Sequence, residues 1–402
     1  MKKYHDIQKK VIILSCIICL MMTSVPLVVG DSFASSSLGG EYYHYFTYQE
    51  MTDLLFELAD EYPDIVHLEN LGYTYGGRTI WMVKLSDNAS ETEQEPGVLL
   101  MGAHHGNEKP SFEAVLFFIQ HMVYNYSKPN MDDDEDGLMN EDPIDGLDND
   151  QDGMIDEDPS EDRVRDVLNN TQIYCIPMVN PDGVEANTRH NCAPNYGPDG
   201  RSDVITSYGV DLNRNYGFRW YFPYFFKDNY YYEWITDDLS GNFRGERPFC
   251  EAESKAVKDF VDATDISISL SYHDYGEWMI FPWMHSSRWT PHERIFRSIG
   301  YNMSRINNYE LKIYGQHGSQ EYLIPRFCGT IGSSENWLYA RHRILAYTME
   351  LCPYRSPSDP AIVYSACYRH VGVNLYICER SWTVEEEKAA VIDPIGRVLS
   401  LF

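Results

Sequence analysis

The sequence predicts one α/β domain, built on a mixed, mostly parallel twisted sheet that helices cover on both faces. Short apolar runs typical of buried strands alternate along the chain with segments of helical period; the strand-like runs are residues 98–101, 173–179, 266–272 and 344–351. Strands that alternate with helices favour a sheet of this kind. No linker-like composition interrupts residues 41–402, so we expect a single domain over this range.

Three segments have the apolar spacing of helices that pack on such a sheet. Residues 49–62 and 251–262 each place their apolar side chains on one helical face. Residues 112–126 are apolar almost throughout, and Pro110 lies near the first turn, where proline fits a helix. Each segment is therefore a predicted helix of the domain.

The chain is strongly acidic, and much of the acidity is local. Its 402 residues hold 32 Lys+Arg against 61 Asp+Glu, a formal charge of −29. Nucleic-acid binders need a basic face for phosphates, so the balance argues against that class. Residues 130–162 alone contain 16 Asp+Glu and no Lys or Arg, and this segment is therefore an acidic insert in the domain.

Residues 1–34 have the pattern of a signal peptide or an N-terminal membrane anchor. Four lysines precede an apolar run at residues 11–29, and residues 32–34 (SFA) are a candidate cleavage site. The run is long enough to span a bilayer, but its Ser, Cys, Thr and Pro residues favour a cleaved signal. We expect a secreted or extracytoplasmic protein that contacts a membrane only if residues 11–29 are retained.

The acidic insert repeats itself with a period of 16 residues. Each copy has carboxylates at positions 1, 3 and 5 followed by a glycine, like the first half of an EF-hand calcium loop, but neither has the glutamate at position 12. The insert can be interpreted as a solvated acidic loop or as a structural Ca²⁺ site, and the two in-register copies favour Ca²⁺ binding. The candidate ligands are Asp132, Asp134, Asp136, Asp148, Asp150 and Asp152.

Residues that follow strand-like runs can supply three metal ligands and a base. His105 and Glu108, three apart after the first run, carry the imidazole and carboxylate typical of catalytic zinc. His273 follows another run, where a neighbouring strand could deliver a third ligand, and Glu350 lies near the end of the last one. Taken singly, each has an ordinary explanation, as a surface residue or as a core carboxylate paired with an arginine.

Further motifs occur along the chain in a fixed order, and together they resemble a known family. They are Thr74–Arg78 with Ile80–Lys84, His105-x-x-Glu108, Asn180-Pro181-Asp182-Gly183, Arg189 in an Arg-x-Asn-x-x-Pro-Asn context, Gly209–Tyr216 (GVDLNRNY), Pro248-Phe249 with Glu251 and Glu253, Ser271–Tyr275, and Trp337 placed 13 residues before Glu350. Over residues 42–351, with the acidic insert as an interruption, this order resembles the zinc carboxypeptidases (peptidase family M14), to which carboxypeptidases A, B and T belong.

The resemblance implies an exported zinc metallocarboxypeptidase that hydrolyses the C-terminal peptide bond of peptides or proteins. It implies one catalytic Zn²⁺ on His105, Glu108 and His273, with a fourth position left for water. Glu350 is then the general base that takes the proton from that water. The first two strands of the sheet are expected at residues 74–78 and 80–84.

The same resemblance assigns substrate-binding roles. Arg189 is expected to stabilise the oxyanion of the tetrahedral intermediate. Asn213 and Arg214 are expected to hold the substrate's terminal carboxylate, which suits a guanidinium fork. Glu335, two residues before Trp337, occupies the position that sets specificity, and an acid there favours C-terminal Lys or Arg.

Two positions depart from the family pattern or need a separate interpretation. A tyrosine on a loop over the substrate is replaced by Cys328, with Tyr322 as a nearby substitute. His104 precedes a ligand on the chain, so we expect its side chain to point away and to be structural.

Two rival functions stay open at this point. The first is an amidohydrolase of the same fold that acts on cell-wall peptides. The second is a calcium-dependent binding protein on an inactive peptidase fold; the complete set of candidate catalytic residues argues against it. Asn213 and Arg214 favour a substrate with a free C-terminus over the amidohydrolase reading.

Overall fold

An eight-stranded sheet forms the centre of the computed structural model, which describes residues 44–126, 128, 161–191, 209–221, 241–285, 288–312 and 330–391. The strand order is β1-β2-β4-β3-β5-β8-β6-β7. The strands are β1 (Val66–Tyr73), β2 (Thr79–Leu85), β3 (Gly97–Met101), β4 (Gln172–Ile176), β5 (Ile268–Asp274), β6 (Trp278–Ile280), β7 (Glu310–Lys312) and β8 (Leu345–Leu351).

The centre of the sheet is parallel and its flanks carry antiparallel pairs. β4, β3, β5 and β8 run parallel to one another, and β6 runs parallel to β7. β1 with β2, β2 with β4, and β6 with β8 are antiparallel. The predicted mixed sheet is therefore confirmed.

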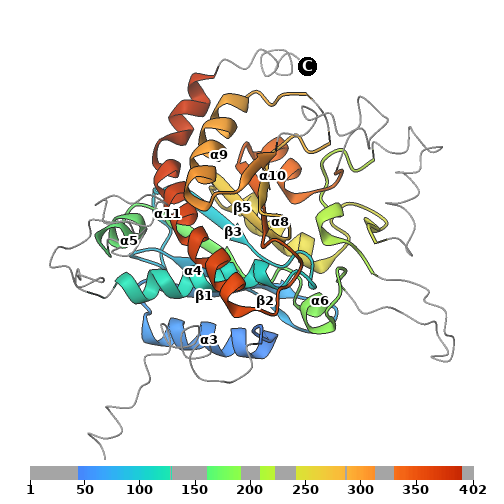
Figure 1. Cartoon of the computed structure of the whole chain (residues 1–402), viewed down its shortest axis with the longest axis horizontal. Coiled ribbons are helices and arrows are strands. Elements are labelled where there is room, and N and C mark those ends of the chain that lie inside the picture. Colours follow the sequence, from blue (N-terminus) through green and yellow to red (C-terminus); the bar gives the residue numbers. More distant parts are fainter. Residues whose placement is uncertain are drawn as a thin grey trace, which may run out of the picture. The chain divides into compact units, whose positions relative to one another are not determined.

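Helices cover both faces of the sheet, as the contacts of the central strands show. Leu99 and Met101 of β3 share an apolar cluster with Val257 of helix α8 (Ala252–Ala263) and Leu338 of α10 (Ser334–His342). On the other side, α4 (Pro110–Tyr126) contacts β3 and β5, and α11 (Pro360–Ala390) packs against α4 and α9 (Glu293–Asn307) (Figure 1). All five residues of β3 are buried, as expected for a strand covered twice.

The remaining helices are short or peripheral. They are α3 (Tyr48–Glu61), which contacts β1, α5 (Glu161–Leu168), α6 (Pro181–Ala186) and a 3₁₀ turn, η1 (Leu212–Arg214). A capping box starts α3: the Glu50 amide donates to Thr47 Oγ1 at 3.2 Å, and the Thr47 amide donates to Glu50 Oε2 at 2.8 Å. None of the helices described here is both long and apolar enough to cross a bilayer.

The structure corrects two sequence-based expectations and adds elements that the sequence did not predict. Residues 74–78 form the turn before β2 instead of a strand, because Gly77 has φ +76° and its amide donates to the Thr74 carbonyl at 3.0 Å. The run 173–179 forms a strand only to Ile176, and β1 was not predicted. Beyond residue 351, where the sequence left the structure open, the chain forms the 31-residue helix α11.

Candidate active site

Three neighbouring parallel strands bring the candidate catalytic residues to one edge of the sheet. His105 follows β3, while His273 and Glu350 lie near the carboxyl ends of β5 and β8. β5 pairs with β3 on one side and with β8 on the other. Clefts at the carboxyl ends of parallel strands are the usual place for ligands in open α/β sheets.

A close backbone contact fixes the loop that carries His105 and Glu108. A Cβ at Gly106 would lie 1.9 Å from the carbonyl carbon of Gly183, so only glycine fits there. Asn180 caps α6, where its Oδ1 accepts from the Gly183 amide at 2.8 Å. Its Nδ2 donates to the carbonyls of His104 and His190 at 3.2 and 3.1 Å. The Asn180–Gly183 turn thus joins the ligand loop to the segment that carries Arg189.

Three ligand atoms converge at this edge. Glu108 Oε2 lies 3.0 Å from Nδ1 of His105 and 2.9 Å from Nδ1 of His273, and the two Nδ1 atoms are 3.1 Å apart. Zinc bonds of 2.0–2.1 Å place tetrahedral ligand atoms about 3.3 Å apart, close to these separations. All three side chains are buried. Two imidazole nitrogens and a carboxylate oxygen that face one another fit a zinc ion.

The far nitrogens of both imidazoles have polar partners that orient the rings. His105 Nε2 lies 3.1 Å from Asp211 Oδ1. His273 Nε2 lies 3.2 Å from Asn213 Nδ2 and 3.3 Å from Ser271 Oγ. An acceptor at the far nitrogen fixes the tautomer and orientation of a metal-binding histidine; Asp211 Oδ1 and Ser271 Oγ can accept here, whereas Asn213 Nδ2 can only donate. Asp211 and Ser271 belong to the sequence motifs, but the motifs alone do not show that these residues orient the two histidines.

Arg189 contacts both Asp211 and the ligand cluster. Its Nε and Nη2 donate to Asp211 Oδ2 at 3.0 and 2.9 Å, and its Nη1 lies 3.3 Å from Glu108 Oε1. Burial alone would raise the pKa of Asp211, but the positive charges of Arg189 and Arg214 hold it well below its usual range. Asp211 therefore carries a negative charge that faces His105 and Arg189.

Arg214 and Asn213 lie beside His273. The Arg214 Nη1 donates to the Asn213 carbonyl at 2.9 Å, and its Nη2 donates to Asn242 Oδ1 at 3.3 Å. Asn213 Oδ1 accepts from the amide and hydroxyl of Ser334 at 2.8 and 3.1 Å. The side chain of Asn213 is thus fixed, and Arg214 lines the same cleft as the ligand cluster.

Glu350 is paired with His273 in the register of β5 and β8 and lines the cleft as well. Burial, together with the negative charge of Glu108, raises the pKa of Glu350 well above its usual value. A carboxyl group with a raised proton affinity next to a metal-ligand cluster is typical of a general base.

Comparison with known proteins decides the family. A model of the zinc carboxypeptidase family (peptidase family M14) matches residues 51–362. The chain belongs to the zinc carboxypeptidase family. It is thus a zinc-dependent peptidase, as the order of its motifs predicted.

Relatives of known sequence and structure agree with this assignment. A zinc carboxypeptidase of Saccharothrix mutabilis subsp. capreolus is 24% identical over 363 residues, which cover 88% of this chain and 72% of the relative. Carboxypeptidase B of Astacus astacus is 23% identical over 321 residues, 76% and 86% of the two chains.

Two solved structures share the fold. Carboxypeptidase A from Helicoverpa armigera superposes with a TM-score of 0.64 at 19% identity, covering 91% of this chain and 81% of that one. Bovine thrombin-activatable fibrinolysis inhibitor in complex with a tick carboxypeptidase inhibitor gives a TM-score of 0.59 at 18% identity, with coverages of 84% and 97%.

The cleft of this carboxypeptidase has a volume of about 270 Å³ and brings most of the predicted site residues together. Its walls include His105, Glu108, Arg189, Asn213, Arg214, His273 and Glu350. Glu335 is not part of the cleft lining as described: it lies in the first turn of α10 with no exposed surface. Neither of its carboxylate oxygens has a hydrogen-bond partner among the described residues.

His104 lies beside this cluster but contributes no ligand atom to it. Its Nε2 is 2.9 Å from the Tyr216 hydroxyl and its Nδ1 is 3.2 Å from Ser271 Oγ. Burial holds the pKa of His104 well below its usual value, so the ring is neutral. These contacts agree with a structural role.

Several predictions concern residues outside the described parts of the carboxypeptidase. They are the signal or anchor at 1–34, the calcium ligands Asp132, Asp134, Asp136, Asp148, Asp150 and Asp152, and the substitution at Cys328 with Tyr322 nearby.

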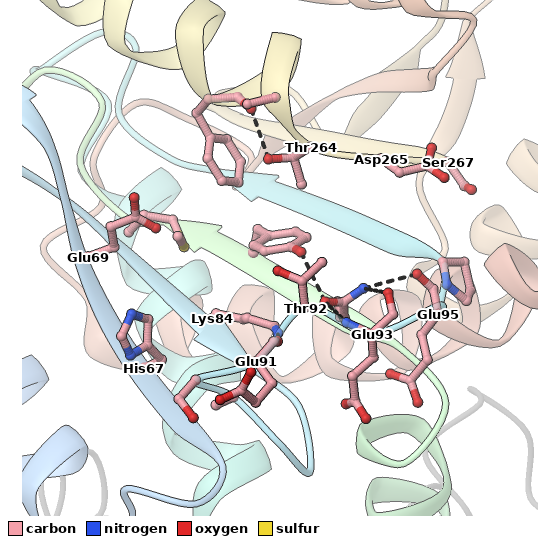
Figure 2. Close-up of a pocket in the computed structure, with 18 of the residues that line it drawn as sticks. His67, Glu69, Lys84, Glu91, Thr92, Glu93, Glu95, Thr264, Asp265 and Ser267 are labelled. Atoms are coloured by element: carbon pink, nitrogen blue, oxygen red, sulfur yellow. Dashed lines mark hydrogen bonds between the residues drawn. The ribbon is translucent and has the colours of Figure 1, made fainter.

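A second cavity, of about 860 Å³, lies at the opposite end of the parallel strands (Figure 2). Residues at the amino ends of β3, β4 and β5, among them Gln172 and Ser267, line it. Figure 2 shows Lys84 among Glu91, Glu93 and Glu95, and burial together with nearby Glu93 raises the pKa of Glu95 to about 7. This cavity contains none of the His105, Glu108 and His273 ligand atoms, so the peptidase chemistry belongs to the other edge.

Proposed function

We propose that this protein is an exported carboxypeptidase that removes single residues from the free C-termini of peptides or proteins. The observation that carries the proposal is the convergence of the His105, Glu108 and His273 ligand atoms within about 3 Å of one another, beside Glu350. Zinc held by these three residues would lower the pKa of a water molecule toward ~7 and would polarise the scissile carbonyl.

Glu350 provides the proton transfers. As a partly buried carboxylate that lines the cleft, it accepts a proton from the attacking water and donates it later to the leaving amine. Burial, together with the negative charge of Glu108, raises the pKa of Glu350 and so favours the first step, in which it takes the proton.

Two arginines supply positive charge where the substrate carries or develops negative charge. Arg189 Nη1, close to Glu108 and His105, stabilises the oxyanion of the tetrahedral intermediate, a contribution of about 3–4 kcal/mol at comparable sites. Arg214, fixed by its bond to the Asn213 carbonyl, receives the terminal carboxylate together with Asn213. A clamp for that carboxylate restricts cleavage to the last peptide bond.

Glu335 supports a preference for C-terminal Lys or Arg. The side chain is fully buried and has no hydrogen-bond partner among the described residues, and a buried carboxyl group without a partner is costly. A basic side chain that reached Glu335 from the cleft would offset this cost. Indifference to Lys, Arg, Leu and Phe at the last position of otherwise identical peptides would remove Glu335 from the specificity role.

The experiment that tests the function compares one peptide as a free acid and as a C-terminal amide. The carboxypeptidase should release the last residue of the free acid as a free amino acid and cleave the amide at least tenfold more slowly. Equal cleavage of both forms, or hydrolysis of cell-wall peptides at bonds away from a free C-terminus, would favour the amidohydrolase.

Export and calcium binding complete the proposal. The lysines and the apolar run of residues 1–34 support export, and the duplicated Asp-rich insert supports a structural Ca²⁺ site. N-terminal sequencing of the protein from the culture medium tests the first, and calorimetric titration with Ca²⁺ tests the second. An intact N-terminus in the cytoplasm, or no heat of Ca²⁺ binding, would contradict them.

A further inference from the structure

A third arginine, Arg355, lines the catalytic cleft a few residues after β8. Its Nη2 lies 4.0 Å from Glu108 Oε1, and 45% of its side chain is exposed. None of the family motifs in this sequence includes it. Its position next to a candidate metal ligand places it where it can contact a substrate bound in the cleft.

The surrounding contacts hold Arg355 in place. Its guanidinium carbon lies 5.6 Å from the centre of the Tyr275 ring, a cation–π contact. The next residue, Ser356, donates from its amide to Asp274 Oδ2 at 2.5 Å and from its hydroxyl to the Asn107 carbonyl at 2.9 Å. The backbone at Arg355 is thus attached both to the end of β5 and to the loop that carries Glu108.

Arg355 differs from the other two arginines of the cleft in its hydrogen bonds to the described residues. Arg189 uses Nε and Nη2 on Asp211, and Arg214 uses both terminal nitrogens on Asn213 and Asn242. Arg355 makes no hydrogen bond with any described residue, and its ion-pair distance to Glu108 is too long for one. A guanidinium that is held in place, and whose donors no described residue occupies, is a receptor for a carboxylate.

We propose that Arg355 binds an acidic side chain of the substrate on the N-terminal side of the scissile bond. This inference rests on the proposed function. Arg214 adjoins Asn213, beside His273, whereas Arg355 adjoins Glu108. A peptide with its carboxylate at Arg214 and its last peptide bond at the ligand cluster continues away from Arg214, and its penultimate side chain can reach Arg355.

The test uses peptide pairs that differ only in the penultimate residue, acetyl-Ala-Ala-Glu-Lys against acetyl-Ala-Ala-Gln-Lys, and the same pair ending in Leu. The zinc-loaded wild type should show a kcat/KM about fivefold higher for the Glu peptide, through a lower KM, as expected for a partly exposed ion pair. Arg355→Gln should reduce this ratio to about one, and Arg355→Lys should keep part of it. Arg341→Gln, which removes an exposed arginine of α10, is the matched control and should keep the wild-type ratio.

Equal kcat/KM values in the wild type, or an undiminished ratio in Arg355→Gln with normal zinc content, would overturn the inference. Calorimetric titration of Glu350→Gln with the same peptides tests the role of Arg355 separately from the proposed function, because binding is measured without turnover. In that background, a fivefold ratio of Kd that Arg355→Gln abolishes would support the role of Arg355. This holds even if the wild type cleaves neither peptide. Absence of cleavage would overturn the proposed function alone.

Discussion

His273 and Glu350 lie directly opposite each other in the parallel pair of β5 and β8. Opposite residues in neighbouring strands point to the same side of the sheet, so a metal ligand and a carboxyl group meet without any loop between them. His105 and Glu108 join them from the end of β3, the strand on the other side of β5. The central parallel strands β3, β5 and β8 therefore position all four residues.

Glu350→Gln tests the role of the carboxyl group. The change keeps the shape of the side chain and removes its basicity, so kcat should fall by about 10²–10⁴-fold. Zinc content should stay at the wild-type value, because Glu350 contributes no atom to the ligand cluster. Steady-state kinetics and metal analysis of the same preparation check both statements; near-normal kcat would exclude Glu350 as the base.

Asp211→Asn tests the residue that orients His105. Loss of its negative charge weakens the contact to His105 Nε2 and both donor bonds from Arg189. We expect zinc affinity to fall by about 10–100-fold, measured by competition with a chromophoric chelator. Asp259→Asn on the exposed side of α8 is the matched control. Unchanged affinity in Asp211→Asn would show that the contact does not support the metal.

The buried carboxyl group of Glu113 should make the stability of the protein depend on pH. It is buried in α4, where its Oε1 accepts from the Phe46 amide at 2.8 Å, and burial raises its pKa from 4.5 to about 8. Between these values the folded protein binds more protons than the unfolded chain, so this residue lowers stability as pH rises, by roughly 1.4 kcal/mol per unit at most.

Glu113→Gln keeps an acceptor for Phe46 and cannot ionise. The free energy of unfolding should therefore rise relative to the wild type as pH increases from about 5 to 8. Urea denaturation at several pH values measures the difference, with Glu57→Gln on the exposed side of α3 as control. The same pH slope in Glu113→Gln and wild type would contradict the explanation.

The sequence predicted that His105, Glu108 and His273 lie close together, but it misplaced some of the elements around them. His105, Glu108 and His273 follow strand-like runs, and parallel strands bring such ends together regardless of the loops between them. β1 was missed because its exposed and buried residues do not form a continuous apolar run. Such a half-exposed edge strand depends on tertiary pairing with β2, which local pattern does not encode.

The positions of two side chains, Glu335 and Arg355, depend on tertiary contacts and could not be predicted from sequence spacing. Glu335 was located by its spacing from Trp337, but spacing does not show that α10 buries it outside the cleft lining. Arg355 follows β8 in an irregular segment in which Cys352 and Ser356 have positive φ angles of 42° and 44°. Contacts with Asp274 and Asn107, distant in sequence, set the path of that segment.

Zinc titration of the chelated protein tests the central claim most directly. His105, Glu108 and His273 form a single three-ligand cluster in the cleft. Release of the C-terminal residue from a free-acid peptide should be absent after chelation, should rise with added zinc, and should reach a plateau at one zinc per chain. Full activity in the metal-free protein, or no recovery at one zinc per chain, would contradict the assignment.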